Sequence, residues 1–143
     1  SLRPPADDWE IAWKENNRAH PLVKDWKFFG VGVVVKNCEL ASEYFLNLGF
    51  SLEKEVYVSK NLGAKLCRLR VGPIMFDLME PVPGDSVYLE CLNIRGEGIA
   101  DMLFIVKDLE SATKELAGKG ADILVSTKEY VLIDARKNGN TII

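Results

Sequence analysis

The stretch Val35-Lys36-Asn37-Cys38-Glu39-Leu40-Ala41 recurs as Val106-Lys107-Asp108-Leu109-Glu110-Ser111-Ala112, and this repetition decides the fold. Matching positions are 71 residues apart, and the same separation relates Gly49 to Gly120 without a gap. In each copy a β-branched strand leads to Asn or Asp, which caps a helix that the glycine ends. Because such half-units rarely bury a sheet alone, we expect two βαβββ modules that pack around a shared concave face.

The remaining segments complete the two modules. Strands are predicted over 28–35, 50–58, 65–71 and 74–79, and again over 99–106, 121–126, 130–136 and 140–143, with helices over 39–48 and 109–119. Gly72-Pro73 and Asn138-Gly139 predict tight turns. The alternative, a ferredoxin-like sandwich, needs two strands between its helices, whereas this chain offers three strands and a linker. The fold class is therefore α+β, a cup-shaped mixed sheet with an N-terminal helical leader.

This pattern divides the chain into four parts. Residues 1–26 form an N-terminal helical extension, whose helix should run from about Trp9 to about Ala19 and pack outside the main domain. Residues 27–80 form the first module, 81–98 a linker with a short helix near 86–93, and 99–143 the second module. The modules together make one structural domain, 27–143. Three tryptophans in the extension predict an anchor to the domain or to a second subunit: Trp9, Trp13 and Trp26.

Composition limits the classes of partner. The chain has 143 residues, 48% of them hydrophobic and 27% charged, with a net charge of −3. This charge gives no electrostatic reason to expect nucleic acid or an anionic membrane as a partner. No apolar run approaches the roughly 20 residues that span a bilayer. Cys38, Cys67 and Cys91 lack C-x-x-C spacing, which favours reduced, packed thiols in a cytoplasmic protein.

Strand alternation predicts which side chains face the cup. In the first strand Val31, Val33 and Val35 should face the helix, leaving Gly30, Gly32 and Val34 on the cup side. The same rule places Met75, Asp77 and Met79 in the cup, together with Asp101, Leu103 and Ile105, while Met102, Phe104 and Val106 face the second helix. Two aspartates from separate modules are therefore expected on the concave face between apolar walls.

Several of these segments resemble the glyoxalase, or vicinal-oxygen-chelate, superfamily. They are Gly30 to Ala41, Asn47-Leu48-Gly49-Phe50 and Phe76-Asp77-Leu78-Met79-Glu80-Pro81. The stretch from Gly84-Asp85-Ser86 to Arg95-Gly96-Glu97-Gly98-Ile99 is similar to methylmalonyl-CoA epimerases. The resemblance implies a glyoxalase-like fold, a homodimer, and isomerase or lyase chemistry. In that chemistry a divalent ion chelates substrate oxygens while a carboxylate moves a proton.

The family's ligand positions are poorly matched here. Gly30 falls where the first histidine is expected, Asp101 where the second is expected, and Asp77 on the third position, while the fourth falls at or just beyond Ile143. Asn61 stands near the epimerase base and cannot accept a proton at neutral pH. His20, the only histidine, cannot rebuild a two-histidine site. A metal, if any, would be Mg, Mn or Ca held weakly by Asp77 and Asp101, because only oxygen ligands remain.

The charges of two nearby carboxylates must be neutralised by a metal cation, by the guanidinium of Arg68 or Arg70, or by a shared proton. We predict Asp77 and Asp101 as catalytic residues. The predicted substrate-binding residues are Gly30, Gly32, Arg68, Arg70, Met75 and Leu103. Gly30 either enlarges the cup or permits close packing of strands.

The resulting hypothesis is a glyoxalase- or epimerase-like protein with a degenerate metal site that handles a small 2-oxo acid or acyl thioester as its small-molecule ligand. One alternative is a metal-free binding protein of the same fold without catalysis. Another is a domain kept only for dimerisation. Residue patterns alone do not choose among these.

Overall fold

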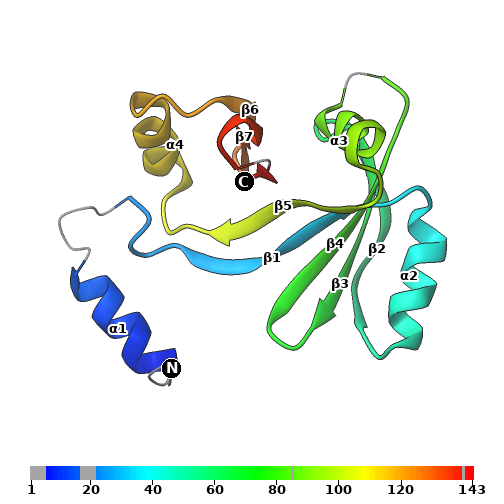
Figure 1. The fold of residues 1–143 in the computed structure, drawn as a ribbon, viewed down its shortest axis with the longest axis horizontal. Helices are drawn as coiled ribbons and strands as arrows, with labels where there is room; N and C mark the ends of the chain where they lie inside the picture. Colours follow the sequence, from blue (N-terminus) through cyan, green and yellow to red (C-terminus); the bar gives the residue numbers. More distant parts are fainter. Residues whose placement is uncertain (1–5, 17–21, 85, 140) are drawn as a thin grey trace.

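The computed structural model describes residues 6–16, 22–84, 86–139 and 141–143. Figure 1 shows the order of the elements along the chain. The strands are β1 (Lys27–Val34), β2 (Ser51–Ser59), β3 (Ala64–Val71), β4 (Ile74–Pro81), β5 (Gly98–Ile105), β6 (Ile123–Ser126), β7 (Val131–Ala135) and β8 (Thr141–Ile142). The helices are α1 (Ala6–Asn16), α2 (Cys38–Asn47), α3 (Val87–Arg95), α4 (Leu109–Gly118) and α5 (Arg136–Gly139).

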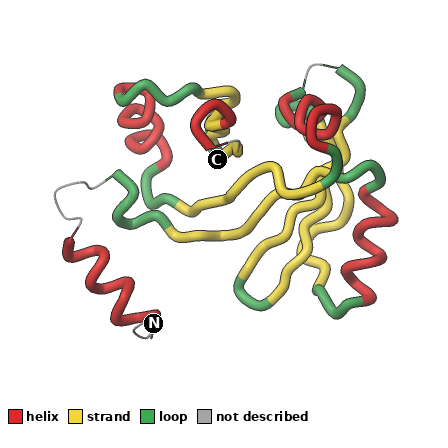
Figure 2. Tube along the Cα trace, in the orientation of Figure 1, coloured by secondary structure: helices red, strands yellow, loops and turns green. Residues whose placement is uncertain are grey.

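The eight strands form one curled mixed sheet in the order β2-β3-β4-β1-β5-β8-β7-β6. β1 pairs in parallel with β4 and antiparallel with β5, so the two halves of the chain meet edge to edge at β1 and β5. The tube in Figure 2 shows these two strands running side by side between the halves. The predicted α+β class and cup-shaped mixed sheet are confirmed.

The repeated stretch folds as its sequence predicts. Asn37 accepts a hydrogen bond from the Leu40 N–H through Oδ1 at 3.0 Å, and Asp108 caps α4 in the same way through the Ser111 N–H at 3.1 Å. Gly49, just after α2, has a φ of 105°, a conformation that glycine adopts without strain. Equivalent sequence signals therefore start both module helices.

Two apolar clusters hold the first module and the linker in place. In one, α2 buries Cys38 against Leu69 and Leu78, with Val33 and Val35 beside them, as strand alternation predicts. In the other, Tyr88 and Cys91 of α3 pack with buried residues of several strands, among them Val34, Leu66, Met79, Ala100 and Ile142. The linker helix is thus part of the core and covers one end of the cup.

The predicted two-residue turn at Asn138-Gly139 is wrong. Residues 136–139 form the helical turn α5, and β7 pairs with β8 through Asp134↔Ile142 and Ala135↔Thr141. Asp134 explains the difference, because its carboxylate accepts bonds from both the Arg136 N–H at 3.1 Å and the Arg136 guanidinium. These bonds favour a helical turn directly after β7.

The N-terminal extension is only partly described. Its helix is α1, Ala6–Asn16, whereas Ala19, His20 and Pro21 lie outside the described residues, as does the side chain of Trp9. Trp26 stacks against Phe104 of β5, with ring centroids 5.6 Å apart, and so links the end of the extension to the sheet. No helix in the described parts of the chain is long and apolar enough to cross a membrane.

Candidate functional site: a carboxylate row in the sheet cup

One row of paired residues crosses the centre of the sheet and carries both predicted catalytic aspartates. Arg68 of β3 pairs with Asp77 of β4, and Asp77 pairs with Gly32 of β1. Gly32 also pairs with Asp101 of β5. The two aspartates therefore flank one glycine, with their backbones two strand spacings, or about 10 Å, apart.

Asp77 is neutralised by Arg68. The Arg68 Nε donates to Asp77 Oδ1 at 2.7 Å, and Nη2 donates to Oδ2 at 2.9 Å, a two-bond arrangement that is among the strongest pairings available to a carboxylate. Asp77 is 6% exposed. The Arg68 guanidinium also lies over the ring of Phe29, 5.1 Å from its centroid. Its bonds to Asp77 raise the pKa of Arg68, so the guanidinium keeps its positive charge.

Asp101 is more buried, at 2% exposed, and has a different partner. The Tyr88 hydroxyl of α3 donates to Asp101 Oδ2 at 2.7 Å. Asp101 Oδ1 is buried without a hydrogen-bond partner among the described residues. Burial raises the pKa of Asp101 to about 6, and the charge of Asp77 adds to this. The Tyr88 hydroxyl opposes this rise in the Asp101 pKa, and the nearby Gly32 N–H opposes it less strongly. The Gly32 N–H makes no well-formed hydrogen bond to Oδ1.

The two glycines of β1 are required by close approaches. A Cβ added to Gly30 would lie 2.0 Å from the backbone oxygen of Met75, so Gly30 permits close strand packing and does not enlarge the cup. A Cβ on Gly32 would lie 2.0 Å from Asp101 Oδ1 and 2.6 Å from Met79 Cε. The position of the Asp101 carboxylate therefore depends on the missing side chain at Gly32.

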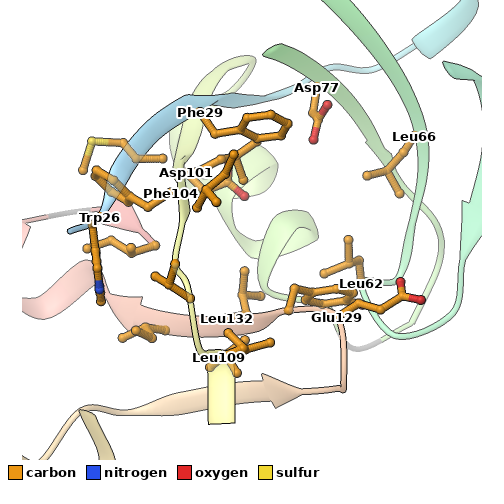
Figure 3. A pocket seen from close by; sticks show the side chains of 18 of the residues that line it. Trp26, Phe29, Leu62, Leu66, Asp77, Asp101, Phe104, Leu109, Glu129 and Leu132 are labelled. Atoms are coloured by element: carbon orange, nitrogen blue, oxygen red, sulfur yellow. The ribbon is translucent and has the colours of Figure 1, made fainter. Parts of the chain in front are cut away.

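The row lies at one side of a cavity of about 490 Å³, a volume typical of small-molecule sites. Figure 3 shows Asp77 and Asp101 on the same side of this cavity, near Phe29. Its aromatic lining is Trp26, Phe29, Tyr57, Tyr88, Phe104 and Tyr130. Lys54 and Glu129 also line it, and Lys54 lies over the Tyr57 ring at 4.0 Å. The site is therefore mostly apolar and aromatic, with a few charged groups.

The lining continues beyond the concave face along β5 and α4. Met102, Phe104 and Val106, which alternation assigns to the helix side, line the cavity together with Leu103 and Ile105. β8 is registered with β5 only at Asp101↔Ile142, so the remainder of β5 has no strand beside it on that edge among the described residues. The cavity is therefore longer than the cup that the sequence predicts.

The predicted site residues separate into two groups. Arg68, Asp77, Asp101 and Leu103 line the cavity, whereas Gly30, Gly32, Arg70 and Met75 are not among its lining residues. Arg70 is exposed and donates to the Gly72 carbonyl at 2.9 Å and to Glu53 at 3.2 Å. Gly30 and Gly32 of β1 and Met75 of β4 belong to the central, paired strands of the sheet.

Sequence reasoning missed Tyr88 and Phe29. The only signal for Tyr88 was a tyrosine on the predicted linker helix, and nothing local indicates that this helix folds over the cup. Alternation continued from Val31 would place Phe29 on the opposite face. The β1–β5 ladder shifts register between Phe28 and Gly30, and this bulge allows Phe29 to face the cavity.

The arrangement does not fit the divalent ion that the fold's resemblance implies. Gly30 offers no donor, and a cation beside Asp77 would be repelled by the guanidinium bound to it. Asp101 is a single carboxylate in contact with Tyr88. Among the described residues no group of three or more His, Cys, Asp or Glu side chains could hold a metal ion. Calcium takes six to eight oxygen ligands, and magnesium in proteins is held by one or two carboxylates free to bind it, whereas here Asp77 is already paired with Arg68.

Comparison with known proteins identifies the fold. No family model matches the chain, and no curated protein sequence matches it. Methylmalonyl-CoA epimerase from Mycobacterium tuberculosis superposes with a TM-score of 0.67 at 24% identity, covering 81% of this chain and 83% of that one. A Streptomyces coelicolor methylmalonyl-CoA epimerase variant in complex with 2-nitronate-propionyl-CoA gives 0.68 at 17% identity, covering 81% and 92%. The hypothetical protein BH1468 from Bacillus halodurans C-125 gives 0.68 at 19% identity, covering 82% and 91%.

These identities are all below 25%, so the comparisons identify a shared fold and leave the activity open. The strand order, the parallel β1–β4 pair and the antiparallel β1–β5 pair agree with that assignment. The chain therefore has the cup-shaped, glyoxalase-like fold that these methylmalonyl-CoA epimerases share.

Proposed function

We propose that the protein binds a small 2-oxo acid or acyl thioester in its cup without a divalent metal ion. The observation that carries the proposal is the two-bond ion pair between Arg68 and Asp77 at the wall of the cavity. The Arg68 guanidinium is bound to the Asp77 carboxylate, which would otherwise be the best metal ligand. The shared fold supports the ligand class, because an epimerase of this fold was solved with 2-nitronate-propionyl-CoA.

Arg68 is suited to receive the polar end of such a ligand. Its Nε and Nη2 bind Asp77, which leaves the Nη1 group without a partner among the described residues. The side chain is 36% exposed and lines the cavity. Asp77 and the Phe29 ring hold the guanidinium in place, so little side-chain entropy is lost when a ligand carboxylate or carbonyl accepts a bond from it. The apolar part of the ligand would contact the aromatic wall.

Calorimetry tests this proposal with 2-oxobutyrate and propionyl-CoA as probes. We expect the same affinity in EDTA and in manganese chloride. Arg68→Gln should weaken binding at least tenfold, since one charged hydrogen bond is worth about 1.5–3 kcal/mol. Arg70→Gln is the matched control, because Arg70 lies on the same strand but does not line the cavity, and it should leave binding unchanged.

Metal analysis of protein purified without chelator gives the opposing result. Stoichiometric manganese or magnesium that is lost in Asp77→Ala, or binding that requires added metal, would refute the metal-free proposal. Failure of both probes to bind at any accessible concentration would refute the ligand class.

A second candidate function is proton transfer at the carbon next to the ligand carbonyl. Asp101 supports it, because a pKa of about 6 is close to the value that suits a general acid or base at neutral pH. Deuterium exchange into propionyl-CoA in heavy water, followed by mass spectrometry, measures this activity. Exchange that disappears in Asp101→Asn would support catalysis. Exchange no faster than the blank, with ligand binding retained, would leave the protein as a binding protein.

A further inference from the structure

We propose that binding of a carboxylate ligand in this cup is coupled to the uptake of a proton by Asp101. The inference rests on the proposed function, since it concerns the ligand of the same cavity. The affinity for an anionic ligand then depends on the protonation of Asp101 on β5, which need not contact the ligand. Tyr88 of α3 sets the pH at which this occurs.

The charges in the cavity wall are not fully balanced. The positive charge of Arg68 is matched by Asp77 through two short bonds. Asp101 has no cation partner among the described residues. Its Oδ2 accepts one bond from a neutral hydroxyl, and its Oδ1 accepts none. When Asp101 is ionised, the centre of the sheet therefore carries one uncompensated negative charge in a buried place.

The groups that face Asp101 do not change this balance. From α3 comes the Tyr88 hydroxyl, and from β4 comes Asp77, whose charge also raises the Asp101 pKa. β1 contributes only the backbone of Gly32, and β8 contributes Ile142. The further charged and titratable groups around the cavity are Lys54, Tyr57, Arg68, Glu129 and Tyr130. Lys54 lies over the Tyr57 ring, and no bond from it to Asp101 is present among the described contacts.

An incoming ligand anion would bring a second uncompensated negative charge into the cavity. A ligand carboxylate on the free Nη1 of Arg68 would stand in the same cavity as Asp101, where the low dielectric makes repulsion between the two negative charges strong. A proton on Asp101 removes that repulsion. Binding and protonation must then favour each other to the same degree, because the coupling between two sites is reciprocal.

Tyr88 opposes the protonation of Asp101. Its hydroxyl donates to Asp101 Oδ2, and this bond favours the ionised form and holds the Asp101 pKa down. Tyr88→Phe should therefore raise the pH at which Asp101 takes its proton. A titrating group elsewhere in the protein would not respond to this variant, which makes the direction of the shift diagnostic.

Calorimetry with 2-oxobutyrate between pH 5 and 8 tests the inference. We expect affinity to rise about tenfold as the pH falls from 8 to 5.5, which corresponds to a one-unit increase in the pKa of Asp101 on binding. Titrations in buffers of different ionisation enthalpy should show net proton uptake between those limits. Asp101→Asn should bind with an affinity that no longer depends on pH, and Tyr88→Phe should move the midpoint to higher pH. Methyl 2-oxobutyrate, which lacks the negative charge, should bind the wild type with no proton uptake.

The control is His20→Gln, because histidine titrates in the same range and His20 lies outside the described residues. This variant should keep the wild-type profile. Absence of binding by both 2-oxobutyrate and propionyl-CoA at every pH would overturn the proposed function and this inference together, and absence of 2-oxobutyrate binding alone would overturn the inference. Binding with constant affinity and no proton uptake would overturn the inference alone. A profile that is unchanged in Tyr88→Phe would also overturn it, even if Asp101→Asn failed to fold.

Discussion

Gly32 and Asp101 face each other across the β1–β5 ladder, and a Cβ on Gly32 would lie 2.0 Å from Asp101 Oδ1. The glycine leaves the volume that the carboxylate occupies. The same glycine pairs on its other side with Asp77, so the smallest residue of β1 separates the two acidic residues. A buried acid therefore exists in this cup because its neighbour has no side chain.

Gly32→Ala should destabilise the protein by about 2–4 kcal/mol, because the new methyl group must displace a buried carboxylate or the strand itself. Urea denaturation measures the change in the free energy of unfolding. The added cost should shrink in an Asp101→Ala background, where the clashing oxygen is absent and the next atom in the way is the flexible end of Met79.

Gly118→Ala is the matched control for that measurement. Gly118 is an exposed residue of α4, and an added Cβ would meet nothing within 4 Å. Alanine has the higher helix propensity, so this variant should be neutral or more stable by up to about 1 kcal/mol. Equal destabilisation by the two substitutions would contradict the close approach of Gly32 and Asp101.

The stability of the protein should depend on pH through Asp101. Its pKa in the folded state is about 6, against 3.8 without the protein environment, so between these values the folded state binds more protons than the unfolded state. The stabilising contribution is complete below pH 3.8 and is lost as the pH rises through 6, amounting to roughly 2–3 kcal/mol. Thermal or urea unfolding of wild type and Asp101→Asn should therefore show a difference that grows between pH 4 and 6.5. Parallel profiles for the two proteins would show that Asp101 is not titrating in this window.

Removal of Arg68 should leave a buried charge without its partner. Arg68→Gln is expected to cost about 2–3 kcal/mol, somewhat less than for a fully buried pair because the Arg68 side chain is 36% exposed. The double variant Arg68→Gln/Asp77→Asn should recover part of that loss. Denaturation of the two single variants and the double variant gives the coupling energy directly.

Arg70→Gln is the comparison for this experiment. Arg70 pairs with Glu53 on the surface, with side-chain exposures of 49% and 35%, so the loss should be below about 1 kcal/mol. A coupling energy near zero between positions 68 and 77 would contradict the role assigned to their ion pair.

The three cysteines should be unreactive in the folded protein. Cys38, Cys67 and Cys91 are all buried, and burial is the main cause that raises the pKa of Cys38 to about 12. Thiolate is the reactive form, so a disulfide reagent at pH 8 should label the native protein far more slowly than the urea-unfolded protein. Rapid labelling of one cysteine under native conditions would reveal local opening around it.

Much of the fold could be predicted because its signals are local. The caps at Asn37 and Asp108, the glycines that end both helices, and the constant separation between the repeated stretches depend on residues close together in sequence. Alternation correctly placed Asp77 and Asp101 on the cavity side, since a period of two holds wherever the strand is regular. Continued to Phe29 the same rule gives the wrong face, because a bulge interrupts the period there.

The site required information that no local pattern contains. Arg68 and Arg70 are equivalent by alternation, and only the register of β3 against β4 assigns Arg68 to Asp77. Tyr88 reaches Asp101 because a linker helix folds over one end of the cup. Similarly, the reason for glycine at positions 30 and 32 appears only when the neighbouring strands are in place.

The sequence by itself therefore determined the repeat, most of the secondary structure and the face on which two acids lie, because hydrophobic period and capping act over a few residues. Only the tertiary structure decided the charge state of those acids. A carboxylate's pKa and its metal affinity depend on burial and on groups brought from distant strands and helices, and here these supply a guanidinium to Asp77 and a hydroxyl to Asp101.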